Sequence, residues 1–206
     1  MPELDAVDSI YSVYARFYDG VFGPFFEHGQ RHAVKMMDIR PGETVLEIGI
    51  GTGALLPFYP KDIDLVGIDF CQEMLDRAML LRDRIGMPNV ELRQMDATQM
   101  HFEDNAFDKL MAAYVISVVP DPIAVGEEMK RVCKKGGEIY FINHFRSNHP
   151  ILGRIEGLLE PIGQRLGFST SLELPELLKG LKLEPVAERA VNLFGMWRIV
   201  KCINDK

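Results

Sequence analysis

The chain has 206 residues, 47% of them hydrophobic, and a net charge of −7 at pH 7. This length predicts one domain with a full core, and the negative charge argues against a dedicated nucleic-acid-binding protein. The three cysteines are far apart and lack metal-ligand spacing, so we expect free thiols, a reducing cytoplasm and no bound metal.

The chain begins with two helical patterns. Apolar residues over 7–26 recur at helical spacing, interrupted around Gly20 and at Gly23-Pro24, and residues 27–39 predict a second helix. We interpret residues 1–35 as a helical lid on the single domain, residues 1–206.

The next segments alternate between strand and helix patterns. Such alternation predicts a parallel sheet with helices on both faces. After a helix near 172–181, two strand patterns joined at Phe194-Gly195 predict a hairpin that makes the last strand antiparallel. Residues 146–170 interrupt the alternation and are interpreted as a helical insertion. Strands are expected at 44–50, 64–69, 90–96, 107–114, 138–145, 182–192 and 196–204, and helices at 71–85 and 121–133.

The stretch 44-TVLEIGIGTGALLP-57 predicts a strand that turns sharply into a helix at Gly49, Gly51 and Gly53. Glycines at such a turn let a ligand approach the backbone closely. The pattern also fits a dinucleotide-binding fingerprint, and a tight turn without a ligand is a further alternative.

Three acidic residues near the predicted strand ends favour a ligand site. Glu47 lies inside a strand that should be apolar, so its carboxylate needs a partner such as a cationic ligand. Asp69 closes the second strand, where a carboxylate can accept both hydroxyls of a ribose. Asp96 and Ala97 close the third strand, where they can contact an adenine.

The ordered motifs EIGIGTG, GIDFCQEML and QMDATQMHFEDNAFDKL resemble those of class I S-adenosylmethionine-dependent methyltransferases. The resemblance implies a Rossmann-like α/β fold with a seven-stranded, mostly parallel sheet whose last strand is antiparallel. It implies S-adenosylmethionine as cofactor, S-adenosylhomocysteine as product, and no metal. It places Glu47 and the three glycines at the donor and Asp69 at the ribose. Its adenine-region residues correspond to Phe70, Met74, Asp96 and Ala97.

The variable segments carry a narrower resemblance, to bacterial phospholipid N-methyltransferases of the Rhodobacter type. It rests on YARFYDGVFG, AAYVISVVPDP, FINHFRS and NLFGMWRIV. The family methylates phosphatidylethanolamine stepwise to phosphatidylcholine, so this chain is expected to do the same at a membrane surface.

Tyrosines supply the candidates for the reacting centre. Tyr11, Tyr14 and Tyr18 share one face of the N-terminal helix, where they either pack or cover the substrate amine by cation–π attraction. With the resemblance, Tyr18 is the best candidate for a residue in catalysis and donor binding. Tyr114, after the fourth strand, is expected to contact the cofactor near the transferring methyl group.

The end of the fifth strand supplies further polar candidates. His144 could accept a proton from the substrate amine, or be a hydrogen-bonded core histidine. Arg146 could hold a phosphodiester, or be an ordinary surface residue. We assign Asn143 and Arg146, with Tyr11 and Tyr14, to substrate binding.

Lipid methylation also requires contact with a bilayer. Residues 131–206 carry a net charge of +4 and residues 1–130 a net charge of −11, so the basic part could face an anionic inner leaflet. The expected location is the cytoplasmic side of the membrane, with peripheral attachment. A soluble methyltransferase for a small amine, phenol or quinone precursor, and a catalytically silent donor-binding module, are the alternatives. An oxidoreductase is the least favoured reading because no second domain is present. The oligomeric state stays unpredicted.

Overall fold

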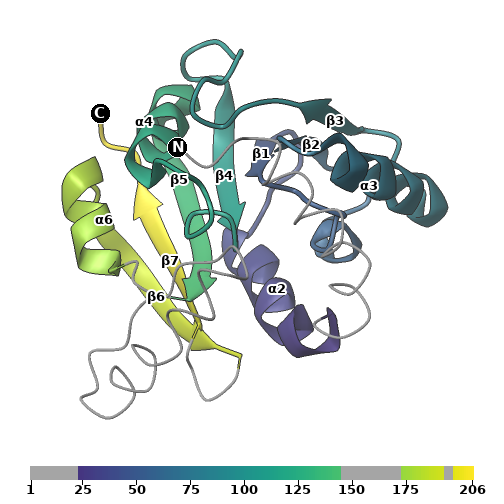
Figure 1. Cartoon of the computed structure of the whole chain (residues 1–206), viewed down its shortest axis with the longest axis horizontal. Helices are drawn as coiled ribbons and strands as arrows, with labels where there is room; N and C mark the ends of the chain where they lie inside the picture. Colours follow the sequence, from purple (N-terminus) through teal and green to yellow (C-terminus); the bar gives the residue numbers. More distant parts are fainter. Residues whose placement is uncertain (1–22, 145–172, 193–196) are drawn as a thin grey trace.

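The computed structural model describes residues 23–144, 173–192 and 197–206. Seven strands form one sheet in the order β3-β2-β1-β4-β5-β7-β6 (Figure 1). Neighbouring strands are parallel except at β7, which is antiparallel to both β5 and β6. The predicted seven-stranded sheet with an antiparallel last strand is therefore confirmed. The strands are β1 Thr44–Ile48, β2 Asp64–Asp69, β3 Val90–Gln94, β4 Phe107–Ala113, β5 Cys133–His144, β6 Pro185–Val191 and β7 Trp197–Ile203.

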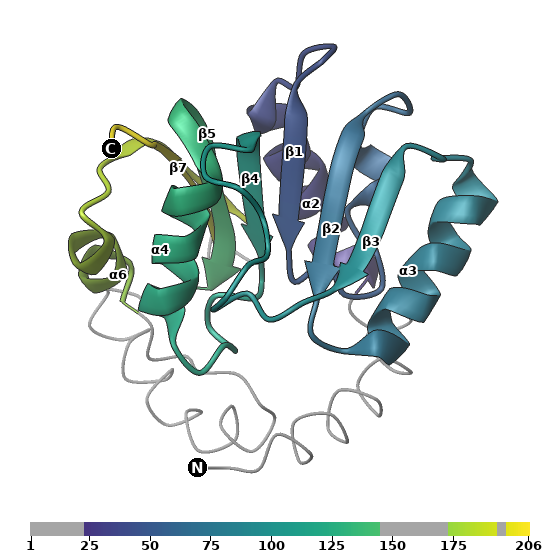
Figure 2. The same ribbon diagram turned by 90° about the horizontal axis from the view of Figure 1, so that it is seen from above.

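Helices cover both faces of the sheet, as predicted (Figure 2). Helices α2 (Gly23–Met37) and α3 (Gln72–Ile85) share one core with the short 3-10 helix η1 (Leu56–Phe58). Helices α4 (Pro122–Val132) and α6 (Leu174–Leu181) belong to the other core. Strand β5 serves both, because Tyr140 and Ile142 face the first core and Ile139 and Phe141 the second.

The order of the strands reverses beside β1, where such a sheet is expected to bind a ligand. The chain proceeds outward from β1 to β2 and β3, then returns to place β4 on the other side of β1. In open α/β sheets, ligands bind where the order reverses, outside the carboxyl ends of the strands. The glycine-containing turn follows β1 at this point, and Tyr114 directly follows β4.

One local prediction about a helix needs correction. The helix expected to begin at the glycines does not form: a series of turns leads instead into η1. Pro57 and Pro60 explain this, because each lacks a backbone N–H and restricts the residue before it. The second predicted helix, 27–39, forms as α2 but begins earlier, at Gly23, which is consistent with the tolerance of proline in a first turn.

Helix ends are held by specific polar groups. The Asp121 carboxylate accepts hydrogen bonds from the N–H groups of Ile123 (3.1 Å) and Ala124 (2.9 Å) and so caps the N-terminus of α4. At the C-terminal end of α2, the buried Lys109 ammonium donates to the carbonyl oxygens of Met37 (2.6 Å) and Asp38 (3.2 Å). A cation there complements the helix dipole and anchors α2 to β4.

Candidate active site

The three glycines after β1 all have positive φ angles, of 67°, 57° and 83° for Gly49, Gly51 and Gly53. A Cβ atom at Gly49 would lie 2.4 Å from a Val115 methyl, and one at Gly53 would lie 2.7 Å from Leu56. A Cβ atom at Gly51 would meet nothing within 4 Å. Packing therefore requires glycine at the outer two positions, whereas Gly51 exposes its backbone to open space that a ligand could occupy.

Asp69 joins the end of β2 to this turn. Its Oδ2 atom accepts a hydrogen bond from the Gly51 N–H (2.8 Å), and its Oδ1 atom accepts one from the Cys71 N–H (2.9 Å). Burial raises the pKa of the Asp69 carboxyl, and the backbone N–H groups oppose that effect. Each oxygen has a second lone pair, so the carboxylate can shape the turn and still accept hydroxyl groups of a ligand.

Glu47 is the most unusual group of the site. The residue is 1% exposed and lies in β1 between Gly67 of β2 and Met111 of β4. Burial raises the pKa of its carboxyl to about 8, and Asp69 adds a smaller repulsion. Within the part of the chain that the structure describes, the Glu47 Oε2 atom has no hydrogen-bond partner. A buried acceptor atom without a hydrogen-bond partner favours a ligand that supplies the missing partner.

Tyr59, which sequence reasoning missed, faces Glu47. Its ring belongs to the core beneath α2, and burial and the Glu47 carboxyl both raise the pKa of its hydroxyl. The hydroxyl in turn lowers the pKa of Glu47, although by less than burial raises it. Their geometry falls short of a formed hydrogen bond, since the Tyr59 hydroxyl has no partner among the described residues either.

The residues assigned to the adenine side lie around the ends of β2 and β3. Phe70 is 44% exposed, and its carbonyl oxygen accepts a hydrogen bond from the Gln94 side chain (3.0 Å). Asp96 is exposed, and its Oδ1 atom accepts from the N–H (2.8 Å) and hydroxyl (2.7 Å) of Thr98. Met74 and Ala97 are partly buried. The exposed ring and the ordered carboxylate are available to an aromatic ligand at this edge.

An aromatic cluster occupies the other side of the crevice. The Tyr114 ring centroid lies 4.9 Å from that of Phe26, which lies 5.3 Å from that of Trp197, and the His144 ring is 5.4 Å from Trp197. Tyr114 has a φ of 60°, a strained conformation for a tyrosine. Sequence reasoning found Tyr114 and His144 but missed Phe26 and Trp197, because their contacts join elements far apart in the chain.

Asn192, also missed, connects this cluster to α2. Its Oδ1 atom accepts a hydrogen bond from the Gly29 N–H (2.9 Å), and its Nδ2 group donates to the Tyr114 hydroxyl (3.3 Å). Its φ of 54° is one that asparagine tolerates better than most residues. Asn143, by contrast, is buried, accepts from Ser117 (3.3 Å) and donates to the His144 carbonyl oxygen (3.0 Å). Its assignment to substrate binding stays a prediction.

Several predicted features lie outside the described residues. They are Tyr11, Tyr14, Tyr18, Arg146, the insertion over 146–170, the Phe194-Gly195 connection and the first 22 residues of the predicted lid. Their expected roles stay predictions.

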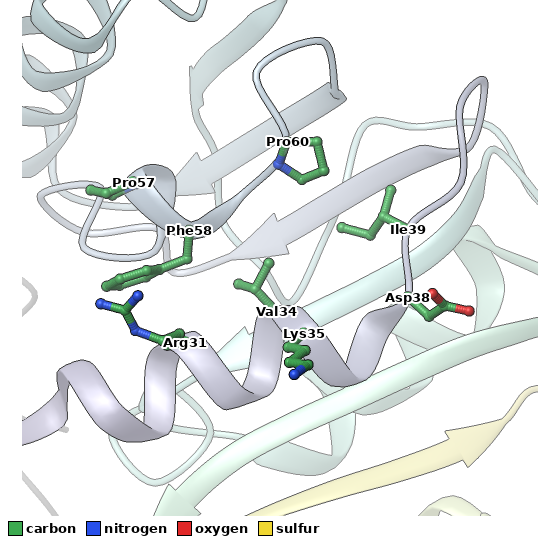
Figure 3. A pocket seen from close by; sticks show the side chains of 8 residues that line it. All are labelled: Arg31, Val34, Lys35, Asp38, Ile39, Pro57, Phe58 and Pro60. Carbon is green, nitrogen blue, oxygen red and sulfur yellow. The ribbon is translucent and has the colours of Figure 1, made fainter.

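A shallow hollow of about 400 Å³ lies between α2 and the segment after η1 (Figure 3). The Arg31 guanidinium lies 5.2 Å from the centroid of the Phe58 ring at its margin. None of Glu47, Gly51, Asp69 and Tyr59 lines this hollow, because the Tyr59 ring packs into the core instead. We therefore place the candidate active site at the carboxyl ends of the strands and not here.

Neither a metal site nor a membrane span is found in the regions that the structure describes. No group of three histidine, cysteine or carboxylate residues there could hold a metal ion. No helix within 23–144, 173–192 or 197–206 is both long enough and apolar enough to cross a bilayer.

Comparison with known proteins identifies the family. Residues 46–141 match the family model of a methyltransferase domain. A phosphatidylethanolamine N-methyltransferase from Cereibacter sphaeroides is 38% identical over 97% of this chain and 98% of its own length. The chain belongs to the S-adenosylmethionine-dependent methyltransferases.

Other relatives place this methyltransferase among enzymes with the same fold. A ubiquinone/menaquinone biosynthesis C-methyltransferase from Bdellovibrio bacteriovorus is 29% identical over 75% of this chain and 68% of its own length. The crystal structure of a SAM-dependent methyltransferase from Aquifex aeolicus superposes with a TM-score of 0.69 at 19% identity, covering 94% of this chain and 97% of that one.

The described residues fit S-adenosylmethionine as the cofactor. The open space at Gly51 admits a ligand to the backbone, Asp69 offers acceptors for hydroxyl groups, and the unpartnered Glu47 carboxyl offers one for a cation. Glu47 and Gly51 belong to β1 and the turn after it, and Asp69 ends the neighbouring strand β2, so the three features lie at one edge of the sheet.

Proposed function

We propose that this methyltransferase methylates phosphatidylethanolamine stepwise towards phosphatidylcholine at the surface of a membrane. The observation that carries the proposal is the 38% identity to the Cereibacter sphaeroides enzyme over nearly the whole of both chains. That match extends well beyond residues 46–141, the part shared with methyltransferases in general. Substrate-specific segments usually lie outside such a common core.

Methyl transfer requires the protein to align the two reactants more than it requires covalent catalysis. When bound, S-adenosylmethionine supplies an electrophilic methyl group, which passes to the nitrogen lone pair of the acceptor as the carbon–sulfur bond breaks. In this proposal Gly51, Glu47 and Asp69 hold the donor at the end of β1 and β2. The crevice orients the two reactants and excludes water.

The acceptor side must tolerate a cation whose methylation increases with each step. The rings of Phe26, Tyr114 and Trp197 form one continuous aromatic wall next to the crevice. Aromatic faces attract ammonium groups by about 0.5–2 kcal/mol, and this attraction survives the loss of N–H donors on methylation. The wall therefore supports an amine substrate better than it supports a neutral phenol.

The amine must lose a proton before each attack, because a simple alkylammonium titrates near pKa 10. His144 ends β5 beside Trp197, and in this proposal it accepts that proton. Tyr18 stays a candidate for the same centre, and Tyr11, Tyr14 and Arg146 stay candidates for binding the head group. We also propose peripheral attachment to the cytoplasmic face of an anionic membrane, favoured by the basic part of the chain after residue 130.

Methylation of a quinone precursor is the second candidate. It is favoured by the Bdellovibrio bacteriovorus relative, although that match covers less of both chains. Carbon methylation of a phenolic ring needs a base for a hydroxyl group and no cation-binding wall. The two candidates therefore differ in substrate and in the role of the aromatic cluster.

A direct assay separates them. The purified chain is incubated with methyl-labelled S-adenosylmethionine and anionic vesicles that contain phosphatidylethanolamine, demethylmenaquinone or both, and the products are separated by chromatography. We expect label in mono-, di- and trimethylated phosphatidylethanolamine. Vesicles without either acceptor control for background transfer. Label in the quinone alone would replace the proposal by the second candidate, and label in neither would refute both.

A further inference from the structure

We propose that Tyr59 is a positioning residue of the donor site, which orients the Glu47 carboxylate so that capture of the donor's cationic end displaces a proton from Glu47. The inference concerns donor binding alone and does not depend on which acceptor is methylated.

The first support is the place of the two groups. Glu47 lies in β1, two residues before Gly49, and Tyr59 directly follows η1. The two residues therefore lie before and after the glycine-containing turn. Both side chains are buried, with 1% exposure for Glu47 and 4% for Tyr59. These two buried groups therefore flank the turn that a ligand at Gly51 would contact.

The second support is their unsatisfied state. The Glu47 Oε2 atom and the Tyr59 hydroxyl are buried and lack partners within the described ranges. A buried donor or acceptor without a hydrogen bond is costly, because it has lost its contact with water. Because the Tyr59 hydroxyl acts on the Glu47 carboxyl, the two groups form a site in which a cation, a carboxylate and a hydroxyl donor would complete one another.

The charges around Glu47 determine its protonation before the donor binds. Tyr59 and the like-charged Asp69 are the titratable groups that act on it. Lys109 lies two residues from Met111 on β4, but its ammonium is held by the end of α2 and by Glu43 (3.3 Å) and Glu138 (3.1 Å). Burial without a bound cation keeps the Glu47 carboxyl protonated at neutral pH.

Donor binding reverses this balance. A cation beside the carboxyl favours its ionised form, so the acidic proton leaves to solvent and a carboxylate remains. The Tyr59 hydroxyl then donates a hydrogen bond to the carboxylate and fixes its orientation. The Tyr59 O–H group keeps its own proton throughout, because burial and Glu47 both raise its pKa.

Calorimetry counts the proton directly. Titrating the full chain with S-adenosylmethionine at pH 7, without acceptor, in two buffers of different ionisation enthalpy gives the number of protons released. We expect about one proton per bound donor at pH 7 and clearly fewer at pH 9, because Glu47 titrates near pH 8. Infrared spectroscopy provides a readout without any variant: a protonated carboxyl band should disappear when the donor binds.

Three variants distinguish positioning from simple packing. Glu47→Gln should bind without releasing a proton. Tyr59→Phe should weaken donor affinity by about threefold to tenfold and should move proton release to higher pH, because the group that lowers the Glu47 pKa is gone. Tyr140→Phe is the matched control. It deletes another hydroxyl from the same core, where it donates to Glu138 (2.6 Å), and should leave both donor affinity and proton count unchanged.

The outcomes are unambiguous. Absence of proton release from the unmodified chain at pH 7, with the carboxyl band unchanged, would overturn the proposal. So would a Tyr59→Phe protein that matches the unmodified chain in affinity and in the pH of proton release. Failure of lipid methylation would leave this result untouched.

Discussion

Asn192 connects α2 to the candidate active site, and its replacement tests that connection. Replacing it by alanine removes the acceptor of the Gly29 N–H and the donor to the Tyr114 hydroxyl. The first bond is worth about 1 kcal/mol, and the second, at 3.3 Å, contributes less. Alanine also fits the φ of 54° poorly, at a cost of about 1 kcal/mol. We therefore expect Asn192→Ala to lower the free energy of unfolding by about 2–3 kcal/mol.

Asn192→Gly divides this cost into its parts. Glycine accepts the positive φ but also loses both hydrogen bonds, so its cost should be about 1 kcal/mol smaller than that of alanine. Asn105 is the matched control, because it has a φ of 59° and is exposed, and no side-chain hydrogen bond is found for it within the described residues. Asn105→Ala should therefore show the backbone cost alone, about 1 kcal/mol.

Urea unfolding followed by circular dichroism measures these differences, provided that the slope with denaturant is the same in all variants. The reasoning predicts that Asn192→Ala is the least stable and that its excess over Asn105→Ala equals the lost hydrogen bonds. Turnover by the Asn192→Ala protein should also fall, because the Tyr114 hydroxyl loses its connection to α2 through Asn192. Equal stabilities for the two alanine variants would refute the role of Asn192 as a connection between α2 and the site.

Three further predictions concern charged groups. Because burial raises the pKa of Glu47, its contribution to stability is present below about pH 4 and is lost as pH rises to 8. Glu47→Gln, with donor absent, should therefore remove up to about 4 kcal/mol of this pH dependence in denaturant titrations. Asp69→Asn places an amide against two backbone N–H groups and should weaken binding of S-adenosylhomocysteine by about tenfold to a hundredfold. An unchanged affinity would contradict the placement of the ligand at Asp69. Lys109→Met removes the cation beside Glu43 and the donor to the Met37 carbonyl oxygen, while Glu138 keeps its ion pair with Lys201. It should destabilise the fold by about 2–3 kcal/mol in thermal unfolding while sparing donor affinity; an unaltered melting temperature would contradict this.

The fold was largely predictable because its determinants are local in sequence. Alternating strand and helix patterns indicated the parallel sheet, and the closing hairpin indicated the antiparallel β7. The helix predicted after the glycines does not form, because the restrictions that Pro57 and Pro60 place on the backbone override the glycine pattern.

The site was predictable only in part. Glu47 and Asp69 stood out because charged residues in or at the end of buried strands need a physical reason. Tyr59, Phe26, Asn192 and Trp197 did not, because each becomes informative only through a neighbour distant in sequence, such as Asn192 through Gly29. Two signals were available in the sequence. Tyr59 lies between Pro57 and Pro60, and Asn192 lies at the end of a predicted strand.

The central claim is that the donor occupies the crevice between the turn after β1 and the end of β2. A crystal structure of the chain with S-adenosylhomocysteine tests it most directly. The account predicts ligand hydroxyls on the Asp69 carboxylate, ligand atoms against the Gly51 backbone, and a hydrogen-bond partner for the Glu47 Oε2 atom. Ligand bound elsewhere, with Glu47 still unpartnered, would contradict it.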